Sequence, residues 1–314
     1  MNPEWPGTVS PQAKQAITAM NAQPAPDVSI PHEQIRQMID AMQQGMGGVQ
    51  LARFGVTVAN TEMAGVPVRV FTPPAGPALA DGAKVLLNLH GGGFMLDSGS
   101  MTENIAMAAL TKLPIVAVLY RLAPEHPFPA AVDDALAVYR ALLSTRDAGQ
   151  IGLYGTSAGA GLSAQLVMRL QAEGLPAPRA MGFFSGSADL ARDGDCEAYL
   201  PPLPGSGSVI ESLAPYAGET DRRDPALSPI FGDLGGFPPT LVLTSTRDQL
   251  LSQSALFHRA LLKAGVEAEL VVFEALPHAF WAYTDLPETD EAFGHMARFF
   301  ARHMQSPRVT HDRG

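Results

Sequence analysis

After residue 80, short runs of apolar residues alternate with longer segments in which apolar residues recur on one helical face. Short apolar runs indicate buried strands, and longer segments with one apolar face indicate helices. The predicted strands are 84–89, 115–120, 151–154, 180–184, 240–244 and 267–273, and the predicted helices are 130–143, 158–173, 252–263 and 288–304. This alternation is typical of a parallel sheet whose strands are connected by crossover helices.

Two regions depart from this alternation. Residues 54–60 and 66–72 alternate with period two on either side of 63–65, which predicts an antiparallel hairpin. Residues 189–233 contain proline and glycine clusters and a single short helical pattern near 209–216. This stretch is too long for an ordinary loop, so we interpret it as a lid insertion, a functional loop or a disordered segment.

The N-terminal residues 1–50 predict two short amphipathic helices. One apolar face contains Ala13, Ala16, Ile17 and Met20, and the second contains Ile35, Met38, Ile39 and Met42. Such helices either dock onto the core or form part of a lid over a site. The expected division is N-terminal cap helices in 1–50, a core in 51–188, a cap insertion in 189–233 and the rest of the core in 234–314.

Composition limits the classes of protein that the chain can belong to. Of its 314 residues, 46% are hydrophobic and 17% charged, as in a globular protein with a sizeable core. The net charge of −10 argues against nucleic acid as a partner and against anionic membranes. Cys196 is the single cysteine, so no intrachain disulfide can form. Without a signal-peptide pattern or an apolar run of ~18 residues, we expect a cytoplasmic protein with no membrane insertion.

The strand predicted at 151–154 runs into a glycine-rich turn around one serine. Gly155, Thr156, Ser157, Ala158 and Gly159 fit the G-x-S-x-G nucleophile elbow, a sharp turn between a strand and a helix. Small neighbours are required because the turn holds its central residue in a strained conformation. The strand before the turn and the helix after it make Ser157 the candidate nucleophile.

A serine hydroxyl needs a base, and the base needs a group that orients it. In a parallel sheet these partners lie on loops after the carboxyl ends of strands. Asp248 follows the strand at 240–244, and His278 follows the strand at 267–273. The order Ser157, Asp248, His278 is the order of the triad in α/β hydrolases. Glu274 and Asp285 are rival acids, but the first is too near its strand end and the second follows the histidine.

The other histidines fit packing, surface or loop positions better: His32, His126, His258, His295, His303 and His311. No pair of histidine, cysteine or aspartate residues has ligand spacing around a strand end, so we expect no metal and no cofactor.

A hydrolytic serine also needs donors for the oxyanion that forms at the carbonyl. His90, Gly91, Gly92 and Gly93 follow the strand at 84–89, where glycine amides are unobstructed by side chains. We expect the amides of Gly91, Gly92 and Ala158 to form the oxyanion hole. A phosphate-binding function is excluded because the G-K-[ST] ending is missing.

These motifs resemble the bacterial hormone-sensitive-lipase-like esterases, a branch of the α/β hydrolases. The resemblance spans about residues 66–303 and rests on HGGGF at 90–94, YRLAPEHPFPA at 120–130, GTSAG at 155–159, the SPI and LGGFPP segments within 228–239, and PH at 277–278. It implies an α/β-hydrolase fold, a mostly parallel central sheet flanked by helices, with a helical cap. The loop residues Tyr120, Arg121 and Glu125 are structural in this interpretation.

Three positions depart from the common pattern of that family. Thr156 stands where most members have aspartate and places the chain in the G-T-S-A-G subgroup, while Ala160 and Gln249 differ from the usual residues. None removes a catalytic group, but they leave the substrate preference open.

The resemblance implies an esterase that cleaves small to medium, fairly hydrophobic carboxylic esters. Lactone hydrolysis and amide hydrolysis, as in related deacetylases, use the same triad and remain alternatives. A non-catalytic ligand receptor is disfavoured because receptors of this type have lost the histidine that His278 supplies. Family members often pair through an edge of the sheet, so a homodimer also remains open.

Overall fold

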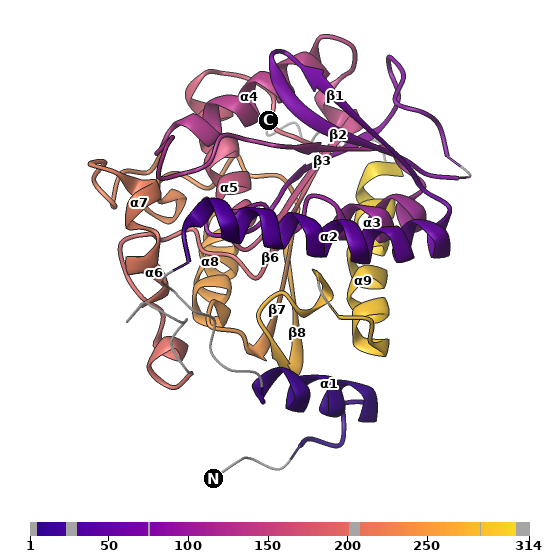
Figure 1. Cartoon of the computed structure of the whole chain (residues 1–314). Helices are drawn as coiled ribbons and strands as arrows, with labels where there is room; N and C mark the ends of the chain where they lie inside the picture. Colours follow the sequence, from indigo (N-terminus) through magenta and orange to yellow (C-terminus); the bar gives the residue numbers. More distant parts are fainter. Residues whose placement is uncertain (1–4, 23–29, 75, 201–207, 283, 306–314) are drawn as a thin grey trace.

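The computed structural model describes residues 5–22, 30–74, 76–200, 208–282 and 284–305 (Figure 1). Within them, one eight-stranded sheet has the order β1-β2-β4-β3-β5-β6-β7-β8. Its strands are β1 (Thr57–Met63), β2 (Val66–Thr72), β3 (Val85–Leu89), β4 (Ile115–Val118), β5 (Ile151–Thr156), β6 (Ala180–Phe184), β7 (Thr240–Arg247) and β8 (Ala268–Pro277). The pairs β1–β2 and β2–β4 are antiparallel, and all other neighbours are parallel. The predicted mostly parallel sheet is confirmed.

Helices cover both faces of the sheet (Figure 1). The α-helices are α1 (Pro11–Asn21), α2 (His32–Phe54), α3 (Thr102–Thr111), α4 (Ala130–Leu143), α5 (Ala158–Ala172), α6 (Val209–Ser212), α7 (Ala214–Ala217), α8 (Leu251–Lys263) and α9 (Pro287–Gln305). Four single turns of 3₁₀-helix lie at Ala148–Gln150, Asp195–Ala198, Pro229–Phe231 and Phe280–Ala282.

The core consists of two apolar layers, one on each face of the sheet. Helices α4, α5 and α8 contribute buried side chains to one layer, whereas α3 and α9 contribute to the other. The strands β3, β4, β5 and β6 are buried along their whole length because helices cover both faces. The nucleophile elbow therefore begins on a central strand that is held rigidly from both sides.

The hairpin and two helices, α2 and α3, differ from the elements predicted from the apolar pattern. Helix α2 continues to Phe54, where Gly55 ends it in the left-handed region at φ 65°, so β1 starts only at Thr57. The turn lies at Ala64 and Gly65, both with positive φ. Helix α3 was missed because its first seven residues are all buried, which leaves no alternation of apolar and polar faces.

The N-terminal helices lie on the core at separate places. Ser10 caps α1 by accepting from the Ala13 amide at 3.0 Å, and its own hydroxyl donates to Glu288 at 2.9 Å. Ala13 and Ile17 are buried in the layer that contains α9. Helix α2 packs along α3. Within the predicted insertion 189–233, the proline and glycine cluster at 201–207 lies outside the described residues.

Within the described ranges, every helix is either too short or too polar to cross a bilayer.

Candidate active site

The turn between β5 and α5 lifts Ser157 out of the sheet. Ser157 adopts φ 58° and ψ −121°, a conformation that few residues other than glycine occupy. A Cβ atom on Gly155 would lie 2.2 Å from the Gly159 carbonyl oxygen, and one on Gly159 would lie 1.9 Å from the Leu89 carbonyl oxygen. Only glycine fits at these two positions, because α5 starts in direct contact with the ends of β3 and β5.

Ser157, His278 and Asp248 form one hydrogen-bonded chain. His278 Nε2 lies 2.9 Å from Ser157 Oγ, and His278 Nδ1 lies 2.7 Å from Asp248 Oδ1. The three residues follow the carboxyl ends of β5, β7 and β8. In the sheet, β7 and β8 are adjacent, and only β6 lies between β5 and β7. The structure therefore brings the three predicted residues together with the spacing of a nucleophile, a base and an orienting acid.

Asp248 is fully buried and accepts several hydrogen bonds besides the one from His278. Thr244 Oγ1 donates to Oδ2 at 2.8 Å, Ser185 Oγ also donates to Oδ2, and the Leu250 amide donates to Oδ1 at 2.9 Å. Burial raises the pKa of Asp248, but the charge of His278 and the hydrogen bonds outweigh it and hold the pKa below its usual value. The carboxylate is therefore ionised and fixed in orientation.

Sequence reasoning did not identify Ser185 and Thr244. Ser185 directly follows β6, and Thr244 lies near the end of β7, beside Asp248. The signal available in the sequence was their position at the carboxyl ends of adjacent strands, where functional groups of parallel sheets gather.

His278 has an environment suited to a base that becomes charged. Burial lowers the pKa of His278, but the negative charge of Asp248 and their hydrogen bond outweigh it and raise the pKa above its ordinary value. The imidazolium is therefore stabilised by a fixed carboxylate on the side away from Ser157.

The loop after β3 brings backbone amides to the nucleophile. A Cβ atom on Gly91 would lie 3.3 Å from Ser157 Cβ, so this glycine approaches the serine closely. Within the described part of the chain, no hydrogen bond uses the amides of Gly91 and Gly92. The His90 ring stacks on Tyr120 at 4.1 Å, and the Tyr120 hydroxyl donates to the His90 carbonyl oxygen at 2.7 Å. These contacts fix the start of the loop.

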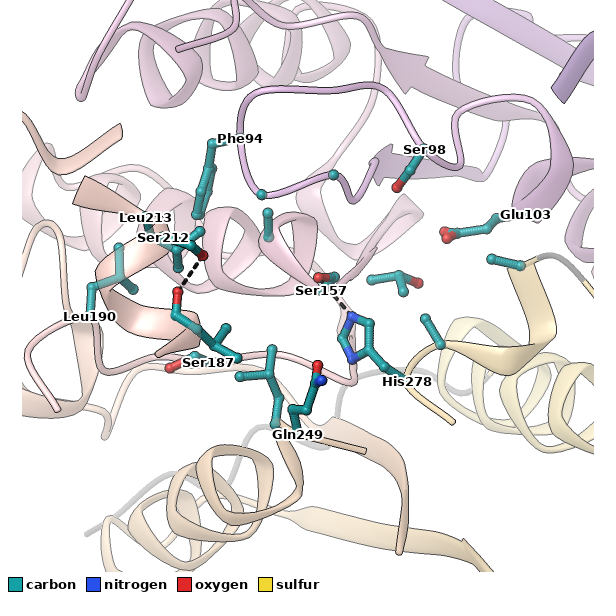
Figure 2. Close-up of a pocket in the computed structure, with 18 residues that line it drawn as sticks. Phe94, Ser98, Glu103, Ser157, Ser187, Leu190, Ser212, Leu213, Gln249 and His278 are labelled. Atoms are coloured by element: carbon teal, nitrogen blue, oxygen red, sulfur yellow. Dashed lines mark hydrogen bonds between the residues drawn. The ribbon is translucent and has the colours of Figure 1, made fainter. Parts of the chain in front are cut away.

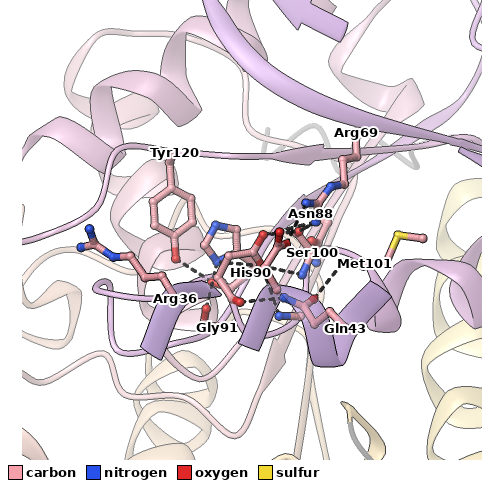
Figure 3. A network of polar contacts seen from close by, with 12 residues as sticks. Arg36, Gln43, Arg69, Asn88, His90, Gly91, Ser100, Met101 and Tyr120 are labelled. Atoms are coloured by element: carbon pink, nitrogen blue, oxygen red, sulfur yellow. Dashed lines mark hydrogen bonds and ion pairs between the residues drawn. The ribbon is translucent and has the colours of Figure 1, made fainter. Parts of the chain in front are cut away.

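A polar network holds the same loop from its outer side (Figure 3). Asp97 pairs with Arg69 at 3.3 Å and accepts from the Ser100 amide at 2.9 Å. Gln43, from α2, donates to the Asp97 carbonyl oxygen at 2.7 Å and accepts from the Met101 amide at 3.1 Å. Gln43 is 1% exposed, so α2 is attached to the loop by a buried amide. The apolar periodicity of α2 gave no indication of this contact.

A cavity of about 210 Å³ opens beside Ser157 (Figure 2). Its lining is mainly apolar and includes Phe94, Leu190, Val209, Leu213, Leu250 and Ala282. The segment 189–233 contributes through Leu190 and α6, whereas no described residue of α1 or α2 lines the cavity. Glu103 and Ser98 lie at one end of it. The cavity can hold a small organic substrate next to the nucleophile.

The rival acids are engaged elsewhere. Glu274 accepts a hydrogen bond from the Thr8 hydroxyl, and Asp285 pairs with Arg53 at 2.9 Å. Neither lines the cavity.

One group of possible metal ligands occurs among the described residues. Glu267, Glu269 and His303 offer ligand atoms within 4.8 Å of one another, but they are exposed or half-buried and do not line the cavity. This group is separate from Ser157.

A serine raised between a central strand and a helix, within hydrogen-bonding distance of a histidine, is the arrangement of the α/β hydrolases. The chain belongs to this family: residues 86–282 match the family model described as "alpha/beta hydrolase fold".

Curated relatives and solved structures agree with this assignment. The chain is 36% identical to an acetyl-hydrolase of Streptomyces hygroscopicus, over 68% of this chain and 73% of the relative. It is 32% identical to an ethyl acetate hydrolase of Pseudomonas putida, over 76% and 79%. The crystal structure of an esterase from the bacterial hormone-sensitive lipase family superposes with a TM-score of 0.81 at 28% identity, covering 94% of this chain and 99% of that chain. The resemblance to that group of esterases is confirmed, and the chain is a carboxylic ester hydrolase.

Proposed function

We propose that this ester hydrolase cleaves small to medium acyl-chain, fairly hydrophobic carboxylic esters through Ser157, His278 and Asp248, with an acyl-enzyme intermediate. The observation that carries the proposal is the hydrogen-bonded chain from Ser157 Oγ to His278 Nε2 at 2.9 Å and from His278 Nδ1 to Asp248 at 2.7 Å. Each residue has the partner that its role requires.

In the proposed reaction, Ser157 Oγ attacks the ester carbonyl while His278 Nε2 takes the serine proton. The amides of Gly91, Gly92 and Ala158 donate to the oxyanion of the tetrahedral intermediate. His278 then returns the proton to the leaving alkoxide, and water, activated by the same imidazole, hydrolyses the acyl-enzyme. Asp248 stays ionised and stabilises the imidazolium in both halves. No step requires a metal or a cofactor.

The cavity supports the proposed range of esters. A volume of about 210 Å³ accommodates a small acyl group together with a small alcohol, and the apolar lining favours uncharged chains. The two relatives, an acetyl-hydrolase and an ethyl acetate hydrolase, also support short acyl groups. We assign the lid to 189–233, whose α6 lines the cavity, and keep 1–50 as its second component.

The proposal is tested by a hydrolysis screen with active-site labelling. p-Nitrophenyl acetate, butyrate, hexanoate and octanoate should be cleaved faster than ε-caprolactone or an acyl anilide, which test the lactone and amide alternatives. An organophosphate should label the wild type once. Ser157→Ala should fold, escape labelling and lose ~10⁴-fold in kcat/KM.

The matched control is Ser144→Ala, which removes an exposed hydroxyl at the end of α4. This variant should be labelled and active like the wild type. Labelling of another serine, or full activity without Ser157, would disprove the assignment of the nucleophile.

A further inference from the structure

The cavity has two arms that differ in chemistry, with Ser157 and His278 between them (Figure 2). The apolar arm contains Phe94, Leu190 and Leu213, together with the two serines Ser187 and Ser212. The opposite arm, which we call the polar arm, contains Ser98 and Glu103. Thr156 also lines the cavity and interacts with Glu103, so it belongs to the polar arm. Figure 2 shows the Glu103 carboxyl group pointing from α3 toward the cavity.

Two polar atoms of the polar arm are buried without a partner. Glu103 is 2% exposed, and within the described residues its Oε2 makes no hydrogen bond. Thr156 Oγ1, which is equally buried, also lacks a partner at hydrogen-bonding geometry among these residues, although the Thr156 hydroxyl lies close enough to the Glu103 carboxyl group to affect its pKa. A buried polar atom without a partner is destabilising, because it has lost its hydrogen bonds to water. Both residues line the cavity next to the nucleophile, so a small rotation of either side chain would bring its polar atom into contact with a bound molecule.

The fold makes room for this carboxyl group. A Cβ atom on Gly99 would lie 2.5 Å from Glu103 Oε1, so the glycine leaves the space that the carboxyl fills. Burial raises the pKa of Glu103, the nearby Thr156 hydroxyl lowers it and Asp97 raises it, with a resulting pKa of about 8. At neutral pH the group is therefore mainly a carboxylic acid, with one O–H donor and one acceptor oxygen.

We infer that the polar arm is a specificity subsite for a hydroxyl group of the substrate, so that the preferred esters carry a hydroxyl substituent on the acyl or the alcohol part. Glu103 and Thr156 are the specificity-determining residues. The inference rests on the proposed function, because it concerns a second part of the same ester.

A hydroxyl group matches the two free atoms better than other substituents. It donates one hydrogen bond and accepts another, which complements a carboxylic acid beside a threonine hydroxyl. An ester with a methyl group at this place leaves both atoms unpaired. Sites built to bind a hydroxyl discriminate strongly against analogues that lack it, for this reason.

The experiment compares matched ester pairs with the full-length protein. For the acyl part, p-nitrophenyl 3-hydroxybutyrate is compared with p-nitrophenyl butyrate. For the alcohol part, 2-hydroxyethyl butyrate is compared with propyl butyrate by titration of released acid. In at least one pair, the wild type should prefer the hydroxylated ester by about tenfold or more in kcat/KM.

Three variants test whether the polar arm causes this preference. Glu103→Met keeps the length and volume of the side chain but removes its hydrogen bonds, so the preference should fall to about one. Glu103→Gln keeps a donor and an acceptor and should retain most of it. Thr156→Val removes the second hydroxyl at nearly constant shape and should reduce the preference severalfold.

The control variant is Thr102→Val. Thr102 neighbours Glu103 on α3 and is buried with an unpartnered hydroxyl, but it does not line the cavity. Its removal should leave the preference unchanged.

The inference is overturned if the wild type shows no hydroxyl preference in either pair, or if the preference survives Glu103→Met and Thr156→Val. Should Glu103→Met fail to fold, Thr156→Val and Glu103→Gln still decide the question. Failure of the proposed function looks different, because p-nitrophenyl butyrate itself would not be cleaved and Ser157 would not be labelled.

Discussion

On the side of Ser157 that faces the sheet, the site is held by hydrogen bonds, whereas on the side that faces α6 and α7 it is closed by apolar packing. On the side that faces the sheet, the Asp248 carboxylate accepts hydrogen bonds from His278, Ser185, Thr244 and the Leu250 amide. Hydrogen bonds depend on direction as well as distance, so this side holds its atoms in one geometry.

The cap side relies on stacked and packed side chains. The Tyr216 ring stacks on Phe94 with centroids 3.6 Å apart, and its hydroxyl donates to Gln165 at 2.6 Å. Leu213 and Val209 line the cavity near this anchor, together with Ser212. Apolar packing is not directional, so it sets the volume and shape of the pocket rather than the position of single atoms.

This difference predicts how substitutions on each side should affect the hydrolysis of different esters. Substitutions of the residues that hold Asp248 and His278 should slow all esters alike, because the same reacting atoms are displaced for each of them. Substitutions on the cap side should change the ratio between esters, because each acyl chain contacts a different part of the apolar surface.

The largest effect is expected for Asp248→Asn. The amide cannot hold His278 in the tautomer that accepts the serine proton, so kcat should fall ~10⁴-fold for acetate and octanoate alike. Circular dichroism and melting curves establish that the variant folds. A loss below tenfold would transfer the acid role to another carboxylate and weaken the comparison.

The pH dependence should be the next largest effect. His278 must be neutral to accept the proton, and Asp248 raises its pKa above the ordinary value of 6.5. The rate kcat/KM should therefore rise with pH through a midpoint above 6.5 and fall about 100-fold two units below that midpoint. The midpoint of this rise should lie at the same pH for esters of all acyl lengths. Undiminished activity at pH 4 would indicate a carboxylate base.

Gln43→Leu tests the outer support of the oxyanion loop. It leaves the Asp97 carbonyl oxygen and the Met101 amide without their partner, so the loop loses its attachment to α2. We expect kcat to fall about tenfold for butyrate and octanoate, less than the loss of a whole oxyanion donor, with their ratio unchanged. Gln44→Leu, at an exposed neighbouring position, is the control. A changed ratio would mean that Gln43 acts on the acyl pocket and would contradict its role as a support of the oxyanion loop.

Leu213→Ala should produce the smallest effect on the rate, and this effect should differ between esters. Leu213 lines the cavity and packs against the oxyanion loop near Gly93. Each methylene group that loses its apolar contact costs ~0.8 kcal/mol, roughly fourfold in rate. The ratio of kcat/KM for octanoate to acetate should therefore shift about fourfold, while the pH profile stays the same. Leu262→Ala, at an exposed position on α8, is the control. An equal loss for all esters would contradict the division between the two sides.

Much of the fold could be predicted from the sequence because it depends on neighbouring residues. The apolar runs at β3, β5, β6 and β7 mark buried strands, and the order of strands and helices then requires a parallel sheet. The glycines around Ser157 report the close contact of strand and helix in one short segment. Asp248 and His278 could be predicted because the fold places strand ends at one edge.

The side chains that support and extend the site are determined by tertiary packing and could not be predicted from the sequence. Gln43 meets Asp97 across 54 positions of sequence, Ser185 meets Asp248 across 63, and Glu103 reaches the cavity from the helix whose burial hid its periodicity. Local patterns report whether a residue is covered or exposed, because burial repeats with the period of a strand or helix. They do not report which distant atom meets a buried polar group. That choice depends on how separate elements pack, and packing arises from the whole chain.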